Sequence, residues 1–123
     1  MPIKIEWDNP EQTIIRATGD NWTTEEFHQQ FDTISTMVRT SNQHIEGIIV
    51  LNLDGEYAKR DYMSVFKRVV RIGKIPTIFV GLTRMQEMML QTVIQIYETD
   101  KPIAIVSTIE EARGILSQNI ANA

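Results

Sequence analysis

The chain contains no cysteine, which excludes disulfide bonds, thiolate catalysis and cysteine-ligated metal sites together. Its two histidines, His28 and His44, lack metal-binding spacing, and we expect both on solvated surface. No glycine-rich phosphate loop is present, and no serine has the sequence context of a nucleophile elbow. The sequence therefore predicts a protein that is not an enzyme and that needs neither a cofactor nor a metal.

Long hydrophobic runs are also missing, so no transmembrane segment is expected. The first six residues lack the basic start and long apolar stretch of a signal peptide, which predicts a cytoplasmic location. The 123 residues fit one domain, 1–123, without a linker or an internal repeat.

Basic residues are scarce outside one segment. The chain has a formal net charge of −4, which disfavours nucleic-acid binding. Segment 59–74 holds six basic residues and one acidic residue, a net charge of +5, so the remainder carries −9. This segment is either a solvated helix face or a patch formed by Arg60, Lys67, Arg71 and Lys74, which steers an acidic partner or the acidic side of a second copy.

Hydrophobic periodicity predicts an α/β fold with elements in the order β-β-α-β-α-β-α-β-α. Strands are expected over 3–7, 13–17, 47–53, 77–80 and 103–106. Helices are expected from 23 or 24 to 39, and over 59–72, 84–98 and 109–117, with a fraying tail at 118–123. The first two strands are close in sequence, which predicts an antiparallel hairpin. The later strands alternate with helices, which predicts parallel strands covered by helices and, with the hairpin, a mixed five-stranded sheet.

Capping residues mark several helix starts. Thr23 with Glu26 and Ser107 with Glu110 have the spacing of capping boxes, and Thr83 is expected to cap the third helix. The loops that follow the parallel strands should converge at one edge of the sheet, which predicts a site there. The candidate residues in those loops are Trp22, Asp54, Glu56, Tyr57 and Thr83.

Two interpretations remain open for these loops. Helix N-termini can bind an anion, although the acidic residues disfavour one, and the loops can equally be ordinary caps and turns. Trp22 can be a binding hot spot or a hydrophobic staple that closes the core.

The third predicted helix is apolar around an unusually wide sector. Met85, Met89, Val93 and Ile96 form one stripe, and Met88 widens the sector beyond it. Such width fits either a thick core or a dimer or partner surface, for which methionine is well suited.

The element order resembles that of the STAS (SpoIIAA-like, anti-sigma-factor antagonist) superfamily over most of the chain. The resemblance also rests on residues 19–27 leading into the first helix, on the apolar strand 48–53 followed by Asp54, and on the helix start at 107–112. It implies a protein-binding regulatory module. Antagonists of the family carry a phosphorylated Ser or Thr after the central strand, whereas residues 54–61 contain neither.

The sequence therefore predicts a non-enzymatic interaction module without an evident phosphoacceptor, which binds a protein partner and self-associates as a homodimer. The predicted partner-binding residues are Trp22, Asp54, Glu56, Tyr57, Arg60, Arg68, Thr83 and Met88. The alternative is a carrier of a small apolar ligand, because SpoIIAA-like folds are similar to the lipid-binding SEC14-type fold. That alternative requires a sizeable apolar cavity in a short chain.

Overall fold

The computed structural model describes residues 3–19, 23–40, 45–51, 59–70, 75–97 and 103–121. The strands are β1 (Ile3–Trp7), β2 (Ile14–Gly19), β3 (Gly47–Leu51), β4 (Thr77–Val80) and β5 (Ile103–Val106). The helices are α1 (Thr24–Thr40), α2 (Lys59–Val70), α3 (Arg84–Tyr97) and α4 (Ile109–Ala121). The predicted α/β class and element order are confirmed. Among the described residues, no helix is long and apolar enough to cross a membrane.

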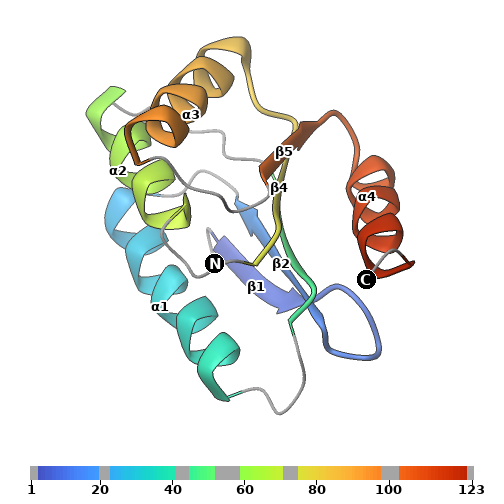
Figure 1. Cartoon of the computed structure of the whole chain (residues 1–123). Helices are drawn as coiled ribbons and strands as arrows, with labels where there is room; N and C mark the ends of the chain where they lie inside the picture. The colour runs from blue at the N-terminus through green and yellow to red at the C-terminus, as the bar shows by residue number, and fades with distance from the viewer. Residues whose placement is uncertain are drawn as a thin grey trace.

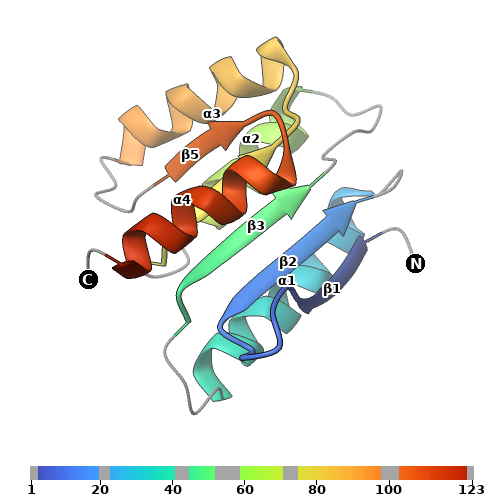
Figure 2. The same ribbon diagram turned by 90° about the vertical axis from the view of Figure 1, so that its right-hand side faces the viewer.

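The sheet has the strand order β1-β2-β3-β4-β5, with β1 antiparallel to β2 and all later pairs parallel. Each crossover therefore steps in the same direction across the sheet. Because such connections are right-handed, their helices must all lie on one face. Helices α1, α2 and α3 do so, whereas α4, which follows the last strand and makes no crossover, covers the opposite face (Figures 1 and 2).

The core divides between these two faces because successive strand residues point to opposite sides. On β3, Ile48 and Val50 face α1, α2 and α3, and Ile49 faces α4. Residues 47–50 are all buried, which confirms that this strand is covered on both faces. The larger cluster is centred on four phenylalanines. The rings of Phe27 and Phe31 of α1 are stacked, and those of Phe66 and Phe79 meet edge to face.

Helix α4 covers only part of its face. It packs against β3, β4 and β5, and Figure 2 shows it in front of the sheet between β5 and β3, away from β1 and β2. The close approach depends on Gly47, where an added Cβ would lie 2.5 Å from a methyl carbon of Leu116. The uncovered half carries the polar side chains Lys4, Glu6 and Arg16.

Three predicted details are wrong. The second strand starts at Ile14 and continues to Gly19, because β1 needs five partners and Ile3 pairs with Gly19. Helix α4 continues to Ala121, since no glycine or proline follows residue 117 to end it. Its capping pair is Thr108 with Glu111, one residue later than predicted, because the N-cap is the residue directly before the first helical residue, Ile109.

The ends of other predicted elements lie outside the described residues, namely 52–53, 71–72 and 98. The capping box of α1 is confirmed: the Thr23 hydroxyl accepts from the Glu26 N–H at 3.2 Å, and the Glu26 carboxylate accepts from the Thr23 N–H at 3.4 Å.

Candidate functional site

The structure describes only part of the predicted partner-binding surface. Trp22, Asp54, Glu56 and Tyr57 lie outside the described residues, and Arg60 is described in its backbone alone. The strand order never reverses along the described sheet, so the switch point that creates a ligand crevice in many α/β proteins is missing there.

Thr83 caps α3, as predicted. Its hydroxyl accepts from the Gln86 N–H at 3.2 Å, and the buried Gln86 side chain accepts from the Thr83 N–H at 2.8 Å. The reciprocal pair resembles a capping box with glutamine in place of glutamate. The geometry gives Thr83 a structural role, and its part in partner binding stays a prediction.

Arg68 forms intramolecular contacts that hold α2 against α1. Its guanidinium forms an ion pair with Asp32, donates to the His28 carbonyl oxygen at 3.1 Å, and lies 5.9 Å from the centre of the Phe31 ring. Much of its hydrogen-bonding capacity is thus used within the chain. A role for Arg68 in steering a partner is untested and competes with these contacts.

His28 is half-buried between α1 and α2, so the prediction that it lies on solvated surface is wrong. Its Nδ1 lies 3.1 Å from the Arg68 guanidinium, and its Nε2 lies 3.2 Å from the Ser64 hydroxyl. Burial, followed by the positive charge of Arg68, lowers the pKa of His28, and Asp32 opposes this effect. Position 28 falls beside the Phe27 and Phe31 stripe, but sequence alone did not show that α2 would cover it.

The Ser64–His28 pair resembles a nucleophile with its base, but its protonation is wrong for that role. A guanidinium can only donate, so Nδ1 must accept from Arg68 and the neutral ring carries its proton on Nε2. Nε2 then donates to Ser64 and has no lone pair to take the serine proton. In catalytic triads the third residue is a carboxylate that imposes the opposite tautomer. This pair therefore serves helix packing.

Helix α3 exposes large apolar side chains. Met85, Met88 and Ile96 are 52%, 64% and 61% exposed, and we call these three residues the α3 ridge. Leu90 and Val93 of the same helix are fully buried, with Met89 half-buried between the two sets. The wide apolar sector predicted from sequence thus has two parts, one in the core and one facing solvent.

The α3 ridge lies on a helix with little charge. Its only charged residues are Arg84 and Glu87, both in the first turn, and residues 88–97 are all uncharged. Helix α2, which packs against α3, contains four basic residues and one acidic residue, a net charge of +3. An apolar surface therefore adjoins a basic helix on a chain whose net charge is −4.

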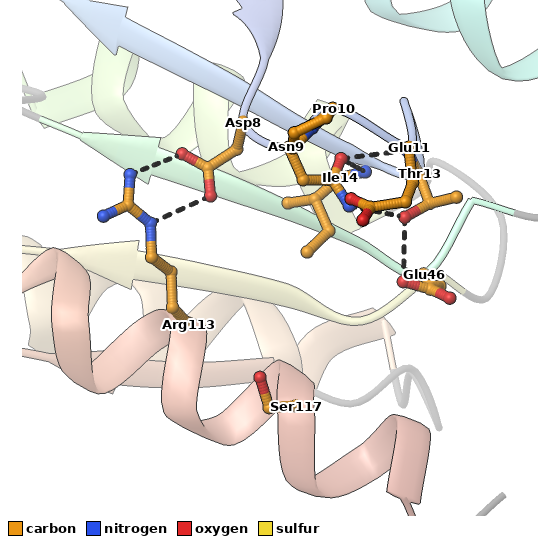
Figure 3. Close-up of a pocket in the computed structure, with 9 residues that line it drawn as sticks. All are labelled: Asp8, Asn9, Pro10, Glu11, Thr13, Ile14, Glu46, Arg113 and Ser117. Atoms are coloured by element: carbon orange, nitrogen blue, oxygen red, sulfur yellow. Dashed lines mark hydrogen bonds and ion pairs between the residues drawn. The ribbon is translucent and has the colours of Figure 1, made fainter.

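A second cluster lies at the opposite edge of the sheet, around the turn between β1 and β2. The Asp8 carboxylate accepts from two nitrogens of Arg113 at 2.8 and 3.0 Å (Figure 3). It also accepts from Arg16 at 2.8 Å, and Arg16 pairs with Glu6 as well. The Asp8 side chain is only 2% exposed. The hydrogen bond from Arg113, followed by the positive charges of both arginines, outweighs burial and lowers the pKa of Asp8.

The same turn is held by Asn9. Its side-chain oxygen accepts from the N–H groups of Thr13 and Ile14 at 3.0 and 3.1 Å, and its amide donates to the Thr13 hydroxyl. That hydroxyl donates in turn to Glu46 at 2.8 Å. Gln12 adopts the left-handed conformation, with φ of 58°, that closes the turn.

These residues line a groove of about 430 Å³ between the turn, the start of β3 and α4. The lining residues are Asp8, Asn9, Pro10, Glu11, Thr13, Ile14, Glu46, Arg113 and Ser117. Three of the nine lining residues, Asp8, Glu11 and Glu46, carry a carboxylate. Within the described part of the chain, no group of three or more carboxylates and histidines is placed to hold a metal ion.

This cluster was not predicted from the sequence. Asp8 and Arg113 are 105 residues apart, and no local pattern links them. In comparisons with known proteins, no family model, no curated protein and no solved structure matches this chain.

Proposed function

We propose that this chain is a non-enzymatic protein-interaction module that binds an acidic amphipathic helix of a partner protein across α2 and α3. The observation that carries the proposal is the exposure of Met85, Met88 and Ile96 on one helix. Exposed apolar surface of this kind typically marks an interaction site, and methionine adapts to varied partner shapes.

The chemistry of the partner follows from the charge around the α3 ridge. The sequence of α2, which packs against α3, contains four basic residues and one acidic residue, and one of the basic residues, Arg68, is paired with Asp32 of α1, while residues 88–97 of α3 carry no charge. A partner helix with an apolar stripe and acidic flanks would bury the ridge and place its carboxylates near α2. The resemblance of the element order to STAS domains also supports a protein-binding role.

The geometry of the polar residues supports the non-enzymatic half of the proposal. Because the Arg68 guanidinium can only donate, neutral His28 carries its proton on Nε2, and this nitrogen therefore cannot take the proton of Ser64. Asp8 is ion-paired with both Arg16 and Arg113, and Arg16 is also paired with Glu6, so these side chains are engaged with one another rather than available as an acid or a base.

The test compares two variants that add the same charge to the same helix. Met88→Glu places a carboxylate on the α3 ridge, and Gln91→Glu places one at an exposed polar position nearby. Each immobilised variant and the original chain are incubated with lysate of the source cells, and retained proteins are quantified by mass spectrometry. The best-retained protein is then purified and its affinity measured directly.

We expect Met88→Glu to weaken that affinity roughly tenfold or more, about 1.4 kcal/mol, and Gln91→Glu to change it less than about twofold. We also expect the affinity to fall with rising salt, since the partner is acidic. Equal effects of the two variants, or no effect of either, would contradict the proposal.

A further inference from the structure

The two edge strands of the sheet differ in charge. On β1, Lys4 and Glu6 are charged, and the Lys4 side chain is 71% exposed. Strand β5 has the sequence Ile-Ala-Ile-Val, and all four residues are half-buried, whereas all four residues of β4 are buried. Charged side chains on an edge strand discourage further pairing, so β1 is protected and β5 lacks this protection.

The free backbone groups of β5 can be identified from one hydrogen bond. The Val106 carbonyl accepts from the Gly81 N–H at 3.0 Å, so the polar backbone groups of Val106 face β4. Because successive residues of a strand point their N–H and C=O groups to alternate sides, those of Ile103 and Ile105 face outward. In the described sheet no strand pairs with that side of β5.

We propose that a second copy of this chain pairs its β5 antiparallel with this edge, which joins the two sheets into one. Ile103 then lies opposite Ile105 of the second copy, and each pair exchanges both backbone hydrogen bonds. Ile103 and Ile105 both pack on the face of α1, α2 and α3, so this register also keeps the two helical layers on the same side.

A second copy is a suitable occupant because β5 carries no charge and can therefore face an identical strand without like-charge repulsion. A two-fold axis through Ala104 pairs every outward-facing backbone group of β5 with an identical strand, as an isologous interface requires. Facing Cα atoms at a non-hydrogen-bonded position approach to about 4.5 Å, and alanine is small enough for that approach. No like charges meet, because β5 has none.

The absence of cysteine permits a direct test by cross-linking. In the proposed dimer, Ala104→Cys places two thiols across the axis, within the Cα separation of about 4.4–6.8 Å that a disulfide spans. Lys4→Cys, on the exposed β1 edge, is the matched control. We expect the original chain at about 100 µM to have twice its mass of 14.2 kDa by light scattering.

We expect Ala104→Cys to form a covalent dimer at least about tenfold faster than Lys4→Cys under mild oxidation. The Ile105 amide in the original chain should also exchange with solvent more slowly as protein concentration rises. A chain that stays monomeric, or an Ala104→Cys variant that cross-links no faster than Lys4→Cys, would overturn the proposal.

This dimer is independent of the α3 ridge. Met88→Glu is expected to dimerise like the original chain, so loss of partner binding and loss of dimerisation are separate results. Ile105→Pro removes an outward N–H without removing a bond to β4, and proline is tolerated at such edge positions. That variant should be monomeric with an unchanged circular dichroism spectrum, whereas a folded dimer of Ile105→Pro would contradict the pairing.

Discussion

The turn between β1 and β2 and the surface of α3 differ in whether their side chains have partners within the chain. At the turn, Asp8 and Asn9 are almost fully engaged by groups of the same chain. On α3, Met85, Met88 and Ile96 are exposed on a helix whose opposite side is buried. Polar groups that satisfy one another stabilise the fold, whereas apolar groups left in solvent indicate binding to another molecule.

The largest expected effect is on the turn. Asp8→Ala should lower the free energy of unfolding by about 2–3 kcal/mol, because Arg113 loses both of its bonds to Asp8 and Arg16 keeps only Glu6. Urea denaturation measures the change. Glu11→Ala, an exposed carboxylate of the same turn, is the control and should stay within about 0.5 kcal/mol of the original chain. If Asp8→Ala lowers the free energy of unfolding no more than Glu11→Ala does, solvent screens the cluster and the account of the turn is wrong.

A somewhat smaller effect is expected at Asn9. Asn9→Ala leaves the N–H groups of Thr13 and Ile14 without their acceptor, and both residues are buried. We expect a loss of about 2 kcal/mol in the same denaturation measurement, together with faster hydrogen exchange at these two amides. Unchanged exchange at Thr13 and Ile14 would mean that Asn9 does not hold the turn.

The smallest expected effect concerns the contact between α1 and α2. The pKa of His28 lies below its ordinary value of 6.5, so the folded chain resists protonation that the unfolded chain accepts. Stability should therefore fall as pH falls below about 6.5 and level off below the folded-state pKa. His28→Gln cannot titrate, and the difference in unfolding free energy between the two proteins should shrink between about pH 7.5 and about pH 5.5. A difference that stays constant or grows over that range would contradict the lowered pKa of His28.

The stability change caused by protonation of Asp8 occurs at lower pH than the change caused by His28. Its pKa is lowered from 3.8, so its stabilisation is present above that value and is lost as pH falls through the folded-state pKa. The two titrations can thus be measured independently in one protein.

The fold could be predicted because its signals are local. The alternation of residues in β1, the aliphatic run of β3 and the caps of α1 and α3 each lie within one short segment. The antiparallel pairing of the first two strands and the parallel direction of the later ones were predicted, because connection length and helix alternation indicate them. The complete strand order was not predicted, since nothing in a single later strand shows which neighbour it pairs with.

The functional details depend on contacts between distant residues. Arg68 meets His28 across 40 positions, and this pairing changes both residues from surface groups into helix-packing groups. Met88 was predicted as a binding residue from helical spacing, but the same spacing did not show that Val93 is buried and Ile96 is exposed. Helix spacing gives the width of an apolar sector, and the position of the sheet and of α2 determines which part is covered.

The most direct test of this account measures stability and partner affinity on the same two variants, Asp8→Ala and Met88→Glu. We predict that Asp8→Ala loses about 2–3 kcal/mol of unfolding free energy while its folded fraction binds the partner normally. We predict the reverse for Met88→Glu, with stability within about 0.5 kcal/mol of the original chain and affinity at least about tenfold weaker. A Met88→Glu variant that is destabilised but binds normally would contradict the assignment of α3 as the binding surface.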